Sequence, residues 1–254
     1  MAEVVKLENI SKFYHTKSGE TEALKNISLS VASGEFVSII GPSGCGKSTV
    51  LSIIAHLEEP SGGKVTINSD KQGKGKGQIG YMLQQDHLFP WLTVRQNALL
   101  GLVLRHNKTE EAEKRVDNLL KQYQLDGFAS AYPNQLSGGM RQRAALIRTL
   151  AIDPAVLLLD EPFSALDYQT RLAVSDDIHF IIKNQRKTAI LVTHDISEAI
   201  SMSDRVVVLS KRPATVKNIY EIKLSGEQTP LQRRKAPEFS TYFQKLWEEL
   251  NENE

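Results

Sequence analysis

A glycine-rich segment that ends in a lysine and a serine carries the clearest chemistry in the sequence. The run GPSGCGKS at 41–48 fits the pattern G-x-x-x-x-G-K-[ST], and Thr49 follows it. Such glycines let the backbone wrap closely around phosphates, and a helix that starts here presents free N–H groups to the anion. We expect Lys47 to bridge the β- and γ-phosphates and the Ser48 hydroxyl to hold Mg²⁺. The candidate nucleotide contacts are Gly41, Pro42, Ser43, Gly44, Cys45, Gly46, Lys47, Ser48 and Thr49.

Two adjacent carboxylates and a histidine follow two apolar runs. Asp160 and Glu161 come directly after the leucines at 157–159, and His194 ends the run 190–194. Parallel strands would bring all three side chains to the same sheet edge, where open α/β sheets bind their ligands. We expect Asp160 to hold Mg²⁺ through water and Glu161 to orient and deprotonate an attacking water. The alternative is that the two carboxylates merely cap a strand.

A second candidate anion site lies at Ser137, Gly138 and Gly139, just before a helical stretch at 144–150. Ser137 can cap that helix, and the glycines leave its first N–H groups exposed. The sequence therefore predicts two separate elements that can hold phosphate.

The elements that must position these residues fall into three patterns. Alternating apolar residues at 27–31, and more weakly at 4–10, predict an antiparallel β layer. Continuous apolar runs predict parallel strands covered on both faces, at 36–40, 155–159, 189–192 and 206–209. Between about 92 and 150 only helical spacing appears, so we expect an inserted helical subdomain in an α/β fold. The lysine- and glycine-rich segment 69–78 is predicted to be a loop between strands.

The bulk composition excludes several kinds of partner and site. With 31 basic and 30 acidic residues the net charge is +1, so we expect no nucleic-acid partner. One cysteine, Cys45, excludes an intrachain disulfide; it is either a pocket residue or a small side chain in a tight turn. No stretch approaches the roughly 18 consecutive apolar residues of a membrane-spanning helix. We therefore expect any membrane association to come through another protein.

Taken together, these motifs resemble those of the ATP-binding subunits of ABC transporters. The segment 136–143, LSGGMRQR, is similar to the family's LSGGQ signature, with Met140 where glutamine is usual. The resemblance covers about 4–222 and implies a P-loop NTPase (RecA-like) core with a mainly parallel sheet, an N-terminal antiparallel β layer and an inserted α-helical subdomain. It implies an ABC ATPase domain at 1–222, with core segments 1–91 and 151–222 and the helical subdomain at 92–150. A C-terminal extension at 223–254 ends in an amphipathic helix.

The resemblance also implies roles for single residues. Tyr14, with Phe13 as the alternative, resembles the aromatic residue that stacks on adenine. Gln84 resembles the Q-loop glutamine, which contributes to the metal site and to catalysis, and Asp167 resembles the D-loop aspartate. His194 resembles the family's switch histidine, and the resemblance implies that it is one of the catalytic residues. The implied cofactors are ATP and Mg²⁺, and the implied partner is a second copy, whose Ser137 element would close over the Lys47 loop.

Three features resemble the ATPases of nitrate, sulfonate and taurine importers: the segment 84–91, the segment 161–167 and the short C-terminus. They imply a separate permease, an extracytoplasmic solute-binding protein and a place at the cytoplasmic face of the membrane. The solute would be a sulfonate, taurine, nitrate or a thiamine precursor. The alternatives are an ABC ATPase that moves no solute and a phosphoryl-transferring enzyme.

Two apolar segments each have two possible interpretations, burial within the chain or contact with a partner. The residues 88–91 either receive the permease or are buried within the helical subdomain. An apolar stripe at helical spacing either packs on the chain's own core or contacts a partner; it consists of Phe239, Phe243, Leu246, Trp247 and Leu250.

Overall fold

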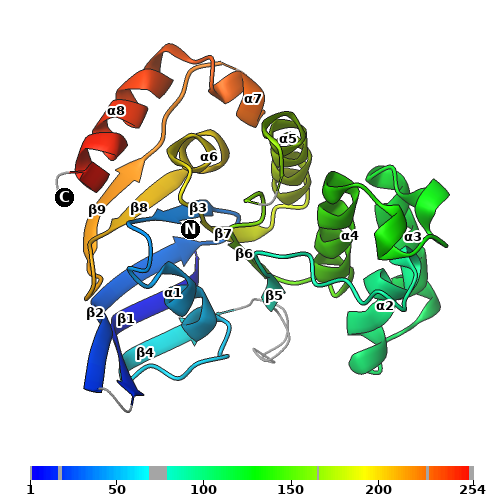
Figure 1. Cartoon of the computed structure of the whole chain (residues 1–254), viewed down its shortest axis with the longest axis horizontal. Coiled ribbons are helices and arrows are strands. Elements are labelled where there is room, and N and C mark those ends of the chain that lie inside the picture. The colour runs from blue at the N-terminus through cyan, green and yellow to red at the C-terminus, as the bar shows by residue number, and fades with distance from the viewer. Residues whose placement is uncertain (1, 17–18, 69–78, 165, 227–228, 252–254) are drawn as a thin grey trace.

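The computed structural model describes residues 2–16, 19–68, 79–164, 166–226 and 229–251 (Figure 1). The predicted loop at 69–78 and Ala165 of the predicted D-loop lie outside these described residues. None of the described helices is long and apolar enough to cross a membrane.

Two β-sheets form the centre of the fold. The antiparallel sheet has the order β2-β1-β4, with β1 at Glu3–Thr16, β2 at Gly19–Ala32 and β4 at Gly62–Ile67. The larger sheet has the order β5-β6-β7-β3-β8-β9 and is parallel except for β9, which runs antiparallel to β8. Its strands are β3 Phe36–Ile40, β5 Ile79–Met82, β6 Val156–Asp160, β7 Thr188–Val192, β8 Arg205–Leu209 and β9 Val216–Glu221.

Continuous apolar strands are buried on both faces of the larger sheet. Strands β3, β6 and β7 are buried along their whole length, as the apolar runs predicted. In β6, Leu157 and Leu159 pack with helices on one face, whereas Leu158 packs with the antiparallel sheet and helix α1 (Lys47–Ile54) on the other. The predicted α/β fold with an antiparallel layer is confirmed.

The helices between the strands divide into two groups. The described residues from 92 to 151 contain helices and no strand: α2 Val94–Leu104, α3 Glu110–Gln122, η1 Asp126–Phe128, η2 Pro133–Gln135 and α4 Gly138–Ala151. Helix α4 packs on α2 and α3, and this group stands to one side of the sheets in Figure 1. The inserted helical subdomain is therefore confirmed as part of the fold, whereas its boundaries at 92 and 150 stay a prediction. The remaining helices are α5 Tyr168–Asn184, α6 Ile196–Met202, α7 Pro230–Arg233 and α8 Pro237–Asn251.

The C-terminal helix covers α6 and β8 with one face. Leu246 is completely buried there, and Phe239 and Leu250 are partly buried against the same core. Trp247 and Phe243, from the same apolar stripe, remain exposed. The stripe therefore packs on the chain's own core on one side, and its other side is exposed.

Truncating Leu246 should weaken the fold, because it deletes a fully buried side chain between α8 and the sheet. We expect Leu246→Ala to lower the free energy of unfolding in urea by about 2–4 kcal/mol. Trp247→Ala, on the exposed side of the same helix, should cost less than about 1 kcal/mol. Equal losses for the two variants would contradict the packing of α8 described above.

Candidate functional site

The loop between β3 and α1 closes around the amine of Lys47. This lysine is buried, and its Nζ donates to the carbonyl oxygens of Gly41 at 2.7 Å and Pro42 at 3.0 Å. A cavity of about 570 Å³ opens beside it. Its lining residues are Ser43, Gly44, Gly46, Lys47, Ser48, Thr49, Glu161, His194 and Arg212.

Two glycines of this loop cannot be replaced without strain. Gly44 and Gly46 have φ values of +69° and +122°, which L side chains rarely adopt. A Cβ on Gly46 would also lie 2.8 Å from Cδ2 of Leu24, which is too close. The loop residues and the buried Lys47 ammonium thus line one cavity, and a glycine-rich loop beside a cation suits phosphate.

Cys45 faces the core and not the cavity. Its side chain is buried within the cluster that joins the antiparallel sheet to α1, and it is absent from the cavity lining. Burial raises the pKa of its thiol, so little thiolate forms near neutral pH. Of the two interpretations of Cys45, the small side chain in a tight turn matches this position.

Two hydroxyl groups hold the carboxylate of Asp160 at the end of β6. The Ser48 hydroxyl donates to Oδ1 at 3.1 Å, and the Tyr81 hydroxyl donates to Oδ2 at 3.1 Å. Burial raises the pKa of Asp160, and burial together with this carboxylate raises the pKa of Tyr81 to about 12. Hydroxyl and carboxylate oxygens side by side are the donor set that Mg²⁺ prefers, so the residues present fit that ion.

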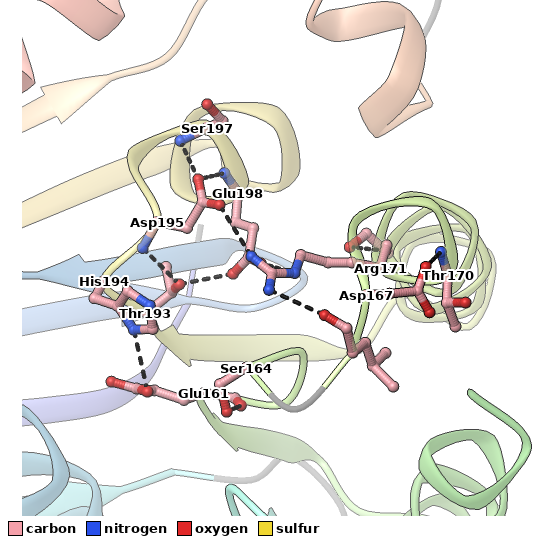
Figure 2. A network of polar contacts seen from close by, with 12 residues as sticks. Glu161, Ser164, Asp167, Thr170, Arg171, Thr193, His194, Asp195, Ser197 and Glu198 are labelled. Carbon is pink, nitrogen blue, oxygen red and sulfur yellow. Dashed lines mark hydrogen bonds and ion pairs between the residues drawn. The ribbon is translucent and has the colours of Figure 1, made fainter. Parts of the chain in front are cut away.

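Gln84 and His194 converge on Glu161. Oε2 of Glu161 lies 3.1 Å from Nδ1 of His194 (Figure 2). The same oxygen accepts a hydrogen bond from Nε2 of Gln84 at 3.3 Å. Glu161 has a φ of +44°, a strained value for a residue with a side chain. Its carbonyl oxygen accepts hydrogen bonds from the backbone N–H of Ser164 at 3.2 Å and from the Ser164 hydroxyl at 3.0 Å, which stabilise the turn.

The second predicted anion site lies elsewhere on the chain. Ser137 caps α4, and its hydroxyl oxygen accepts the backbone N–H of Met140 at 3.3 Å. Neither Ser137 nor the glycines at 138 and 139 line the cavity of the Lys47 loop. In Figure 1, α4 lies with α2 and α3, apart from α1. One chain therefore does not bring its two phosphate-holding elements together.

Asp167 and Tyr14 also lie outside the cavity lining. Asp167 is exposed and caps α5, accepting the backbone N–H of Thr170 at 3.1 Å. Hydrogen bonds with the side chain of Thr170 and then with its backbone lower the pKa of Asp167. The Tyr14 hydroxyl donates to Oε2 of Glu58 at 2.6 Å and lies 3.2 Å from the hydroxyl of Thr49, a cavity residue. The Tyr14 ring thus borders the start of α1 without entering the cavity.

Sequence reasoning missed Arg212 and Tyr81. The Arg212 guanidinium lines the cavity and donates to the carbonyl oxygen of Gly44 at 2.6 Å. Arg212 follows β8, the parallel neighbour of β3, so the rule that used strand ends to find His194 could also have found it. Tyr81 carries no such signal, because it lies within the short strand β5 and only the pairing of β5 with β6 brings it to Asp160.

Comparisons with known proteins agree with this geometry. The sequence profile of the family described as ABC transporter matches residues 24–164. An uncharacterized ABC transporter ATP-binding protein, YtlC of Bacillus subtilis (strain 168), is 47% identical over 96% of this chain and 95% of its own length. An aliphatic sulfonates import ATP-binding protein, SsuB of Bacillus thuringiensis subsp. konkukian (strain 97-27), is 41% identical over 87% of each chain.

A solved structure has the same fold. It is the dimeric, post-hydrolysis state of the ATP-binding cassette MJ0796 bound to ADP and Pi. Its TM-score is 0.74 at 37% identity, over 86% of this chain and 99% of the other. With the phosphate loop, the paired carboxylates and the capped LSGG segment in place, the chain belongs to the ABC transporter ATP-binding proteins and is an ABC ATPase.

Proposed function

We propose that this chain hydrolyses ATP in a site shared between two copies and thereby energises the uptake of a small solute through a separate permease. The observation that carries the proposal is the convergence of Gln84 and His194 on Glu161, beside the Lys47 loop. This arrangement places a candidate base and His194 in the same cavity as the phosphate loop, with Gln84 bound to the base from outside the cavity lining.

The phosphate loop binds the nucleotide, and the side chains at the edge of the sheet catalyse its hydrolysis. Lys47 and the loop N–H groups hold the outer phosphates, and Ser48, Asp160 and the amide oxygen of Gln84 would hold Mg²⁺, which when bound neutralises phosphate charge. Glu161 orients the attacking water and accepts its proton. His194 fixes the Glu161 carboxylate through Nδ1 and reaches the terminal phosphate from the same edge. Tyr14 borders the side of the cavity where we place the adenine.

A second copy supplies the missing half of the site. Ser137 and the backbone N–H groups of Gly138 and Gly139 lie away from the cavity in one chain, so we infer that they close over the nucleotide of the partner, with Asp167 at the same interface. The dimer of MJ0796 supports this arrangement. Closure excludes water and aligns the reacting groups, and hydrolysis then creates like-charged products that separate the copies.

The segment after Gln84 is our candidate for the permease contact. Leu88 is buried, whereas Phe89 and Trp91 are exposed, 37% and 68% respectively, with ring centroids 5.2 Å apart. Arg148 of helix α4 donates to the carbonyl oxygens of Asp86 and His87, both at 2.7 Å. The segment just before the aromatic pair is therefore hydrogen-bonded to α4, the helix that Ser137 caps. A displacement of the pair would thus be transmitted to α4.

The similarity to SsuB supports import of a sulfonate-like solute, with taurine, nitrate or a thiamine precursor as the other candidates. We place the chain at the cytoplasmic face of the membrane, bound to the permease. An extracytoplasmic binding protein would deliver the solute. The rival of a non-transporting ABC ATPase provides no explanation for the exposed pair Phe89 and Trp91.

Removing the charge of Glu161 should stop turnover without preventing nucleotide binding. We expect Glu161→Gln to lower the ATPase rate at least about 100-fold and to trap an ATP-bound dimer, visible by size-exclusion chromatography, because both phosphate-holding elements remain. Lys47→Ala should instead raise the Kd for ATP and form no dimer. Near-normal hydrolysis by Glu161→Gln would show that the base lies elsewhere.

Arg212 should strengthen nucleotide binding without acting in the chemical step. Its guanidinium holds the Gly44 carbonyl and adds positive charge to the cavity, so Arg212→Ala should weaken ATP and ADP binding about tenfold while kcat stays within about twofold. Lys211→Ala, the exposed neighbour, is the control. Fluorescent-nucleotide titration and steady-state kinetics measure the two effects, and unchanged affinity would exclude Arg212 from the site.

Placing a charge on the aromatic pair should uncouple the ATPase from its permease. We expect Trp91→Arg to leave the basal ATPase of the isolated chain unchanged but to abolish solute-stimulated hydrolysis in reconstituted permease vesicles, because an exposed apolar contact is replaced by a cation. Ile219→Arg, which alters a similarly exposed residue of β9, should retain the stimulation. Full stimulation with Trp91→Arg would refute this contact.

A further inference from the structure

A partly buried polar network joins the loop that follows β6 to the loop that follows β7 (Figure 2). Arg171, in the first turn of α5, lies at its centre. Its Nη2 donates to the carbonyl oxygen of Leu166 at 3.1 Å, and its Nη1 lies 3.5 Å from Oδ2 of Asp195. Its Nε lies 3.8 Å from Oε1 of Glu198. One guanidinium thus contacts a carbonyl of one loop, the carboxylate of Asp195 at the end of the other loop, and the carboxylate of Glu198 in α6.

Glu198 is the buried end of this network. It is 3% exposed, and Oε2 accepts the hydroxyl of Thr193 at 2.7 Å. The same hydroxyl oxygen accepts the backbone N–H of Asp195 at 3.0 Å. A buried carboxylate is costly unless a cation and hydrogen bonds compensate it. Burial raises the pKa of Glu198, and the charges of Arg171 and of Arg234, from beside α7, oppose that shift.

Each of the two loops contains a residue of the proposed site, His194 or Asp167, directly beside a residue that the network holds in place. His194 lies between Thr193 and Asp195, and the network holds both. Asp195 is also fixed as the N-cap of α6, where Oδ1 accepts the N–H groups of Ser197 and Glu198. On the other side, Asp167 follows directly after the Leu166 carbonyl that Arg171 holds. A shift of the Asp167 loop therefore acts on the His194 loop through one side chain.

We propose that Arg171 and Glu198 are a positioning pair that couples the Asp167 loop to His194, so that docking of the second copy on Asp167 fixes His194 in its place beside Glu161. The inference rests on the proposed function, because it gives the docking of two copies a route to the catalytic groups. Neither residue touches substrate. A planar fork is needed to reach the carbonyl and the carboxylates together, which a lysine cannot reproduce.

The test compares full-length Arg171→Gln, Glu198→Gln and the double variant with wild type. Lys183→Gln is the matched control, since Lys183 is a partly buried cation of the same helix whose Nζ lies 2.6 Å from Oδ2 of Asp204, a residue outside the site. Three quantities are measured: kcat at saturating ATP, the Kd for ATP, and the NMR signal of the His194 imidazole, assigned with His194→Ala. Thermal unfolding of each variant accompanies these measurements.

We expect both single variants to lower kcat by about tenfold to a hundredfold, the loss typical of a small misplacement, while the Kd for ATP stays within about twofold. The His194 signal should shift in both, and the double variant should be no slower than the slower single variant. Lys183→Gln should change neither kcat nor the His194 signal. If Arg171→Gln does not fold, Arg171→Lys replaces it, with a smaller loss of kcat and the same shift of His194.

A wild-type kcat with an unmoved His194 signal in folded Arg171 and Glu198 variants would overturn the inference. Additive losses in the double variant would overturn it too, because the two residues would then act separately. Other results would contradict the proposed ATPase function itself. In that case the wild-type chain would not hydrolyse ATP, or Glu161→Gln would retain its turnover, whatever the Arg171 variants do.

Discussion

The separation of two helix N-termini within one chain is the constraint on which the proposed mechanism depends. Helix α1 begins at the Lys47 loop, between the antiparallel sheet and the core sheet, whereas α4 begins at Gly138, is capped by Ser137 and packs on α2 and α3. Each start offers free N–H groups to an anion. Because the core packing holds these helices apart, a triphosphate in the cavity of one chain meets only one of them. In the proposed mechanism a second copy supplies the other helix N-terminus.

The register of the core sheet assembles the half-site that each chain does contain. Strands β3, β6 and β7 are parallel neighbours, and Asp160 pairs with Val192, so their ends lie level. The backbone N–H of Glu161 then donates to Val192 at 2.8 Å, and that of Thr193 to Ile39 at 3.3 Å. These hydrogen bonds continue the pairing of the strands by one residue past their ends. The phosphate loop, the carboxylates and His194 consequently meet at one edge.

Much of this arrangement could be predicted because its signals are local or follow from strand order. The runs at 36–40, 155–159 and 189–192 predicted buried strands within one residue at each end, and their following residues predicted the shared edge. Helix α1 starts at the phosphate loop as expected and ends at Ile54, and His56 just beyond it takes a φ of +55°. The strands on either side of the predicted loop 69–78, β4 and β5, were expected without bounds, and β9 was missed, because all three are short or half-exposed and lack a clean period. Tyr81 and the Arg171 network depend on tertiary pairing, which no single segment encodes.

The most direct test of the shared site mixes two inactive variants, Lys47→Ala and Ser137→Arg. If one site takes Lys47 from one copy and Ser137 from the other, a mixed pair has one site with both defects and one site with none. A shared site predicts that ATPase activity, absent from each variant alone, returns on mixing and reaches its maximum near equal amounts of the two. Continued inactivity of a mixture shown by crosslinking to contain mixed pairs would contradict it, because both halves would then have to come from the same chain.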